Sequence, residues 1–228
     1  FGTEPYSEQP LMPTKKIEGL RSDGTLHMDH KLVIHKPIPK EGKLHLEKVI
    51  SAVYDRGEGK GAKINVDIIA KDGAGEPVFT NTMGYLNRWA GGFGGPKVPH
   101  STVVIPEREA DYQIKDAYPE NVPLLYRLTG DTYPLHADPA FAKKAGFDRP
   151  IVHGLCSLGY ACRMMIGALF PGEPERMVSI ENQFRAVALP GDHFTLCVWK
   201  TGKNEALFRM VKDSDGKAIL DYGRMTWK

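Results

Sequence analysis

The chain has 228 residues, enough for one large domain or two small ones with an extensive core. Lys and Arg total 30 against 28 Asp and Glu, and the net charge of +2 gives no indication of a nucleic-acid partner. The three cysteines, Cys156, Cys162 and Cys197, show no metal-ligand spacing, and their odd number argues against a disulfide framework. No charge-free apolar run reaches membrane-spanning length, so no membrane association is expected.

The first half of the chain is predicted to open irregularly and then to form an antiparallel sheet. Three prolines within residues 1–23 prevent a regular helix there. From residue 31 onward, Val, Ile, Thr and aromatic residues partly alternate with polar ones between turn signals, which is typical of strands. The predicted strands are 31–36, 44–56, 62–71 and 77–90. A glycine-rich loop at 91–97 and a linker to about Asn121 are expected to follow.

The second half repeats this plan after a long apolar helix. The helix is predicted over residues 151–170, with Arg163 as its only charge, and a helix that is apolar on nearly every side is expected to be buried against a sheet. The strands predicted after it are 179–189, 194–202, 205–213 and 218–227. The two halves, divided near residue 120, indicate an internal duplication of one helix-plus-antiparallel-sheet unit. Their sheets are expected to pair edge to edge, because that pairing covers two exposed edges.

An Asp and a His five residues apart form the candidate catalytic pair, and only the second half carries them. Pro134 lies between Asp131 and His136, so both are expected on a constrained loop rather than on one helical face. Downstream, Gly154 lies near the start of the long helix, where backbone N–H groups have no partner and the helix dipole is positive. An acid/base pair beside such a helix start indicates chemistry on a carbonyl that becomes negatively charged.

Other chemistries are weaker interpretations of the same residues. A metal site could be built from His136, Asp138 and His153, but these residues lack the usual compact ligand spacing. Cys156 and Ser157 lie near a helix start and could be nucleophiles, yet burial in the apolar helix is the simpler interpretation. The loop GGFGG lacks the spacing of a dinucleotide-binding motif and is more typical of a sharp turn or a close backbone approach.

The segment GDTYPLHADPAFAKKAGFDRPIVHG, residues 130–154, closely resembles the motif of the hydratase 2 family, the (R)-specific 2-enoyl-CoA hydratases related to MaoC. The resemblance extends into the first half through LHMDHKLVIHKPIPKEGKL, SAVYDRGEGKGAKINVDI and AGGFGGPK. The resemblance covers nearly the whole chain from about residue 24. The chain as a whole is similar to the hydratase unit of peroxisomal multifunctional enzymes of type 2. Such a combined pattern is highly specific.

The resemblance implies an α+β double hot-dog fold that hydrates trans-2-enoyl-CoA to (3R)-3-hydroxyacyl-CoA. Residues 1–120 would form a non-catalytic half that accommodates the acyl chain and lacks part of its opening segment, and residues 121–228 would form the catalytic half. Acyl-CoA is then the substrate, no metal or other cofactor is expected, and the family implies a homodimer. The location would be cytoplasmic in a bacterium or peroxisomal in a eukaryote, and no address is visible in the sequence.

The resemblance also assigns roles by position. Asp131 and His136 match the catalytic pair, with the base left open between them, and Gly154 matches the oxyanion-hole glycine. The residues that fall where the family contacts the CoA substrate are His27, Met28, Arg56, Thr132, Tyr133, Pro134, Leu135 and Phe184. Tyr133 replaces a common Asn, and Met28 replaces a common Gly, which changes the expected shape of the pocket. A thioesterase on the same fold and a non-catalytic acyl-CoA binding module remain the alternative functions.

Overall fold

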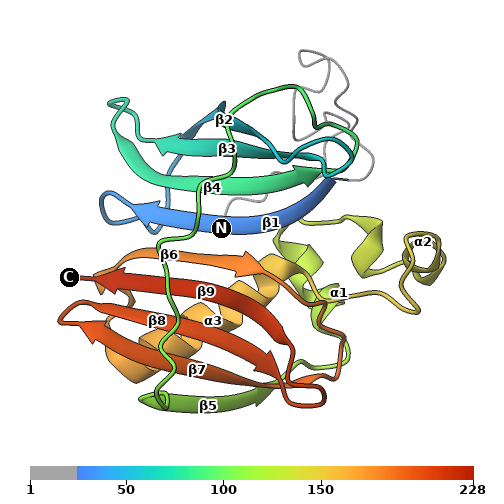
Figure 1. Cartoon of the computed structure of the whole chain (residues 1–228). Helices are drawn as coiled ribbons and strands as arrows, with labels where there is room; N and C mark the ends of the chain where they lie inside the picture. Colours follow the sequence, from blue (N-terminus) through green and yellow to red (C-terminus); the bar gives the residue numbers. More distant parts are fainter. Residues whose placement is uncertain (1–24) are drawn as a thin grey trace.

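Nine antiparallel strands form one continuous sheet in the computed structural model, which describes residues 25–228 (Figure 1). The strands are β1 (Thr25–Ile34), β2 (His45–Asp55), β3 (Ala62–Lys71), β4 (Pro77–Asn87), β5 (Tyr112–Ala117), β6 (Met177–Phe184), β7 (His193–Gly202), β8 (Glu205–Lys212) and β9 (Ala218–Trp227). The helices are α1 (Val122–Tyr126), α2 (Pro139–Lys144) and α3 (Gly154–Leu169), and 3₁₀ turns cover Arg127–Thr129, Pro134–His136 and Pro174–Arg176. Within residues 25–228, no helix is long and apolar enough to span a membrane.

The strand order repeats within the sheet and confirms the predicted duplication. The order is β2-β3-β4-β1-β6-β9-β8-β7-β5, so each half runs outward from its own first strand in the same sequence. The halves meet where β1 pairs antiparallel with β6, from Asp29 opposite Gln183 to Val33 opposite Ser179. The expected edge-to-edge pairing and the double hot-dog fold are therefore both confirmed.

Each half has its own apolar core on the sheet. In β3, one residue in two is buried, as a strand with one buried face requires. Ile64, Val66 and Ile68 of this strand join Met83 and Tyr85 of β4 in the smaller core of the first half. The larger core lies mainly in the second half, where α3 lies against β6, β7 and β9, and it also includes Leu32 of β1.

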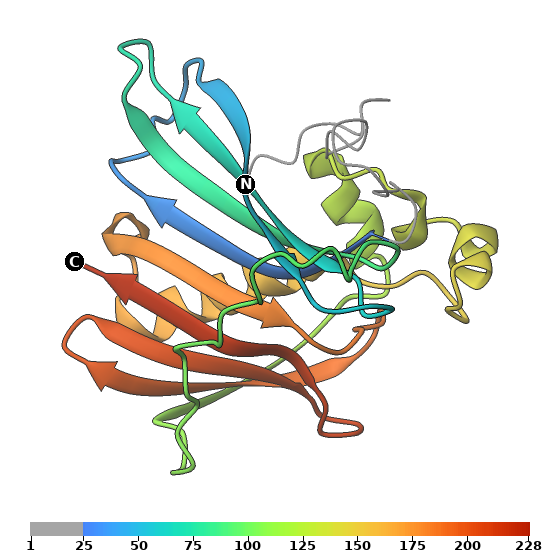
Figure 2. The same ribbon diagram turned by 45° about the horizontal axis from the view of Figure 1, so that its top comes forward.

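Helix α3 is shorter and less enclosed than predicted. It begins at Gly154 rather than at residue 151, because Val152 is still extended and donates its N–H to the carbonyl of Ala188. The expectation of burial on every side was wrong, since Arg163 and Gly167 are exposed along one edge. The sheet covers one side of the helix, as the turned view shows (Figure 2).

The linker predicted between residues 98 and 121 was wrong in part, because it contains a strand. Residues Tyr112–Ala117 form β5, which pairs with β7 at the edge of the sheet. This edge strand has only six residues, of which three are polar, so its hydrophobic pattern was too short to give a clear signal. The irregular opening predicted for residues 1–23 lies outside the described residues, and so does the proposed shortfall of the first half at its start.

The functional candidates gather at one end of the sheet. This end of the sheet, beside α1 and α2, holds the start of β1, the ends of β2, β4 and β6, and the start of α3 (Figures 1 and 2). Antiparallel topology causes this arrangement, since strand ends and the loops between them alternate between the two ends of a sheet.

Candidate active site

The loop from Gly130 to His136 is constrained by a left-handed glycine, a short turn and a proline. Gly130 ends a 3₁₀ turn with φ of 116°, a conformation that favours glycine. The Asp131 carboxylate then accepts the N–H of Tyr133 at 3.2 Å. Tyr133 is extended, as expected before Pro134, and the next 3₁₀ turn ends at His136. Asp131 and His136 therefore occupy a loop, as the proline between them indicated.

The backbone fixes the tautomer of His136. Its Nδ1 lies 2.8 Å from the carbonyl oxygen of Ile151, and a carbonyl can only accept, so Nδ1 carries the proton. The other ring nitrogen, Nε2, is left with a lone pair in the neutral ring. Burial lowers the pKa of His136, although the Ile151 carbonyl and the negative charge of Asp131 oppose this decrease. His136 can therefore accept a proton at neutral pH.

A second histidine supports the first. His153 is only 1% exposed, and its ring stacks on that of His136 at 3.7 Å between centroids with an interplanar angle of 25°. On another side it contacts Tyr126 at 4.6 Å. Burial lowers the pKa of His153 to about 3, and repulsion from His136 contributes. The sequence suggested His153 only as a metal ligand, because its packing against His136 depends on the fold.

Gly154 combines a helix start with the absence of a side chain. It is the first residue of α3, and among residues 25–228 its N–H has no hydrogen-bond acceptor. A Cβ atom at this position would lie 3.0 Å from Cδ1 and Cε1 of the Phe184 ring, closer than ordinary packing allows. Glycine is therefore required by the approach of Phe184, and the amide remains available to a ligand.

The first half contributes an aromatic wall next to this helix start. The ring of His27 lies 4.8 Å from that of Phe184 and 5.1 Å from that of Tyr85, measured between centroids. The register of β1 against β4 shifts between His27 and Asp29, so Met28 lies at a β-bulge, a feature common beside active sites. Burial is the main cause that raises the pKa of Tyr85, and the negative charge of Asp131 raises it further. The two groups therefore lie near each other. Tyr85 was not predicted.

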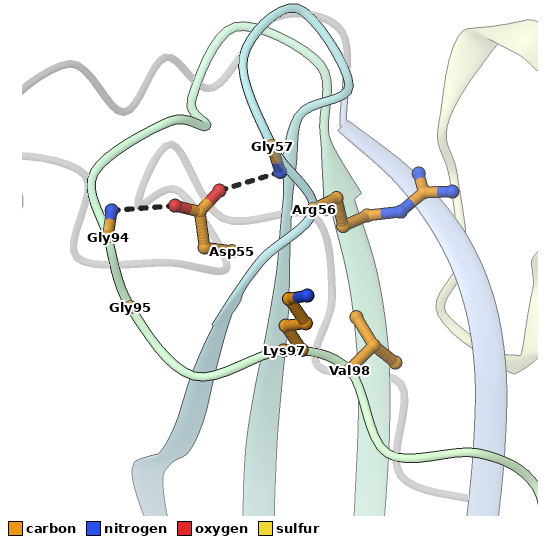
Figure 3. Close-up of a pocket in the computed structure, with 7 residues that line it drawn as sticks. All are labelled: Asp55, Arg56, Gly57, Gly94, Gly95, Lys97 and Val98. Carbon is orange, nitrogen blue, oxygen red and sulfur yellow. Dashed lines mark hydrogen bonds between the residues drawn. The ribbon is translucent and has the colours of Figure 1, made fainter.

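The structure does not bring all predicted substrate contacts together. His27, Phe184 and Gly154 are in contact, and Met28 is next to His27 in the chain. Thr132 and Tyr133 are exposed on the loop, whereas Pro134 and Leu135 are half-buried there. Arg56 lies apart, in an open pocket of about 610 Å³ that Asp55, Gly57, Gly94, Gly95, Lys97 and Val98 also line (Figure 3).

The alternative chemistries find little support in the surroundings of their residues. Asp138 caps α2 by accepting the N–H groups of Ala140 and Phe141, so its carboxylate is already engaged. No group of three or more His, Cys, Asp or Glu side chains within residues 25–228 is arranged to hold a metal ion. Ser157 is buried and accepts the hydroxyl proton of Tyr118 at 2.8 Å. Burial raises the pKa of Cys156 to about 12, so its thiol stays protonated and is a poor nucleophile.

The MaoC like domain family matches residues 101–220, which is more than half of the chain. The MFE-2 hydratase 2 N-terminal domain family matches residues 8–88. The chain belongs to the MaoC-like hydratase 2 family. The two matches lie in different halves of the sheet, and the MaoC like domain match includes the loop with Asp131 and His136 and the start of α3.

Similar proteins are enoyl-CoA hydratases and dehydratases. The hydratase is 35% identical over 213 residues to a probable enoyl-CoA hydratase 2 of Dictyostelium discoideum, covering 91% of this chain and 72% of the relative. It is 31% identical over 219 residues to the peroxisomal enoyl-CoA hydratase 2 of Arabidopsis thaliana, covering 90% and 70%. A MaoC-like dehydratase from Phytophthora capsici has a TM-score of 0.83 at 32% identity, covering 90% and 72%. The chain is therefore a hydro-lyase of the enoyl-CoA hydratase 2 family.

The buried histidines predict a loss of stability in mild acid. Burial lowers the pKa of His27 and His153 to about 3 and that of His30 to about 4, from an ordinary value of 6.5. Below pH 6.5 the unfolded chain therefore binds protons that the folded chain does not. The free energy of unfolding should fall as pH drops from 6.5 toward 4, by up to about 1.4 kcal/mol per pH unit for each histidine.

Urea unfolding at a series of pH values measures this slope. His30→Gln should reduce the slope between pH 6 and pH 4.5 by about one proton, because it removes one of the groups that titrates only in the unfolded chain. The exposed His193 provides the control, and His193→Gln should keep the wild-type slope. Equal slopes for wild type and His30→Gln would contradict the assignment of a neutral, buried His30.

Proposed function

We propose that the hydratase adds water to trans-2-enoyl-CoA and produces (3R)-3-hydroxyacyl-CoA, with Asp131 and His136 as the acid/base pair. The observation that carries this proposal is the state of His136. Its Nδ1 proton is held by a backbone carbonyl, its ring is kept neutral by burial, and Asp131 is close enough to affect its charge. A neutral imidazole beside a carboxylate is suited to moving one proton to and from a water molecule.

The helix start supports the same reaction. An enoyl thioester reacts with water at Cβ only when its carbonyl oxygen can accept negative charge. The N–H of Gly154, at the positive end of α3, is a donor for that oxygen. As the water oxygen bonds to Cβ, one water proton passes to the pair, and the electrons of the double bond move toward the carbonyl. The pair then delivers one proton to Cα, and the enolate collapses to the 3-hydroxyacyl thioester.

Asp131 and His136 are proposed to act on one water as a unit. The charge of Asp131 raises the pKa of His136 against the effect of burial, and in this proposal the proton taken from water is held by the pair rather than by one residue. Phe184 and His27 would line the path of the acyl group next to Gly154, and the exposed Thr132 and Tyr133 would face the thioester arm. In this scheme the second half supplies the chemistry and the first half supplies one wall of the site.

Incubation with trans-2-decenoyl-CoA tests the reaction itself. We expect enoyl absorbance to fall without release of free CoA thiol, because water adds at Cβ and the thioester bond stays intact. Chiral analysis of the product should give the (3R) isomer. Stoichiometric thiol release would indicate a thioesterase, no turnover would favour a binding module, and a predominantly (3S) product would exclude the proposed stereochemistry.

Substitution of the pair tests the mechanism. Asp131→Asn and His136→Gln should each lower kcat by at least about a hundredfold, the usual scale for a positioned acid or base, with little change in KM. The double variant should be scarcely worse than either single variant if both residues act on one water. His193→Gln, far from the loop in sequence and exposed, serves as the matched control and should keep wild-type kcat. Near wild-type turnover in one of the single variants would remove that residue from the mechanism.

The first half is proposed to accommodate the acyl chain along its apolar face. Ile64, Val66, Ile68 and Met83 form a core there that ends at Tyr85, next to His27. Each buried methylene could add up to about 0.8 kcal/mol of binding. The ratio kcat/KM should therefore rise from a four-carbon to a ten-carbon enoyl-CoA, and activity should persist at sixteen carbons. A chain-length series under one set of conditions measures this, and a preference for four carbons with no activity at ten would rule out an acyl site in this half.

A further inference from the structure

Three polar side chains are buried together where the two halves of the sheet join. His30 of β1 lies directly opposite Asn182 of β6, and Asn81 of β4 lies opposite Leu32, two residues further along β1. Paired residues and residues two apart share one face of a sheet, so all three side chains lie on the face that carries Leu32. Leu32 packs into the larger core with α3. His30, Asn81 and Asn182 therefore form a polar cluster within the apolar inner face of the sheet.

The polar cluster lacks hydrogen-bond partners. His30 and Asn81 are each 2% exposed, and Asn182 is 3% exposed. Among residues 25–228, no partner is found for either ring nitrogen of His30, for Oδ1 of Asn81, or for Oδ1 and Nδ2 of Asn182. Buried polar groups are nearly always paired, and an unpaired one destabilises the fold. A ligand that pairs with these atoms accounts for their presence better than packing does.

The chemistry of the polar cluster matches a small neutral group. Burial lowers the pKa of His30 to about 4, against the opposing effect of the nearby Asn81, so the ring is neutral and has one donor and one acceptor nitrogen. Asn182 adds an NH₂ donor, and the Asn81 oxygen adds an acceptor. A carboxylate or a phosphate would be buried here without a countercharge. A hydroxyl group can donate to one of these side chains and accept from another.

The polar cluster lies beyond the aromatic wall, beside the path proposed for the acyl chain. Phe184 lies against Gly154, and His27 contacts Phe184. The ring of His30 lies 5.6 Å from that of His27 between centroids, which is about the length of four carbon–carbon bonds. Opposite His30 in β4 is Met83, a member of the apolar core of the first half. The Met83 side chain is flexible and can move aside, so an acyl chain that starts at Gly154 can reach the polar cluster.

We infer that the polar cluster binds a hydroxyl group carried by the acyl chain, several carbons beyond the reacting double bond. The inference rests on the proposed function, because it assumes that the acyl chain lies along the first half. The amide of Asn182 or the ring N–H of His30 donates to the hydroxyl oxygen, and Oδ1 of Asn81 accepts the hydroxyl proton. An unsubstituted chain leaves these atoms unpaired, and a site built to bond a hydroxyl discriminates against the analogue that lacks it.

Three substrates with equal chain length test the inference in the wild type. The ratio kcat/KM should be at least about tenfold higher for 8-hydroxy-trans-2-decenoyl-CoA than for trans-2-decenoyl-CoA, because only the first pairs with the polar cluster. The 5-hydroxy isomer, whose hydroxyl reaches only the aromatic wall, should show no such gain. Equal kcat/KM for all three substrates would overturn the inference.

Substitutions in the polar cluster should reverse this preference. Asn182→Leu, similar in size but apolar, should lower kcat/KM for the 8-hydroxy substrate at least about tenfold and raise it for trans-2-decenoyl-CoA. His30→Phe should shift both values in the same directions and serves as a second variant if Asn182→Leu does not fold. Asn204 is exposed in the turn between β7 and β8, and Asn204→Leu is the matched control that should keep the wild-type preference. An equal loss on both substrates in Asn182→Leu and His30→Phe would show that the polar cluster has only a structural role.

Binding of saturated thioesters separates this inference from the proposed function. Calorimetric titration should give a lower Kd for 8-hydroxydecanoyl-CoA than for decanoyl-CoA, and Asn182→Leu should abolish the difference. If this holds while neither enoyl thioester is hydrated, the hydroxyl site stands and the proposed reaction fails. If trans-2-decenoyl-CoA is hydrated but the two saturated thioesters bind equally, the polar cluster holds bound water only, and the reaction stands without a hydroxyl site.

Discussion

The pairing of β1 with β6 is the constraint on which the site depends. The one sheet continues from the first half to the second through this pair of strands, and the larger core also crosses the pairing through Leu32 of β1. The pairing sets His27 of the first half against Phe184 of the second, and Phe184 in turn lies against Gly154. The start of α3 would therefore lack one wall if the register of β1 and β6 changed, because a slip of one residue turns every side chain to the other face.

Burial is the main cause of the charge state of the histidines at the site. An imidazolium next to the start of α3 would be repelled by the positive end of the helix dipole and would lose its hydration. His153 and His136 are therefore favoured as neutral rings, and His27, in the first half, is neutral for the same reason. With these rings uncharged, Asp131 is the negative group of the loop, and the Gly154 amide is the positive pole available to a developing oxyanion.

Periodicity and turn chemistry predicted most of the long strands, the duplication and the loop that carries Asp131 and His136, but they placed the first strand at 31–36 instead of Thr25–Ile34. They failed where local sequence does not determine the structure. The edge strand β5 has only six residues, so its pairing with β7 identifies it better than its sequence does. The bulge at Met28 depends on the register of β1 against β4. The contacts of His153 and Asp55 depend on elements far apart in the sequence, which no pattern of spacing could have brought together.

The duplication has a consequence for how a substrate can be held. In the proposed arrangement the reacting end lies at a loop of the second half, whereas His27 and Tyr85 of the first half supply one wall, so one substrate contacts both halves. If the two halves were separate copies of one unit, each would have to supply both the acid/base loop and the aromatic wall. In a fused chain the two sequences can differ, and the β1–β6 pairing keeps their relative position fixed. A continuous sheet, rather than a mobile interface, then fixes the distance between the parts of the site that contact one substrate.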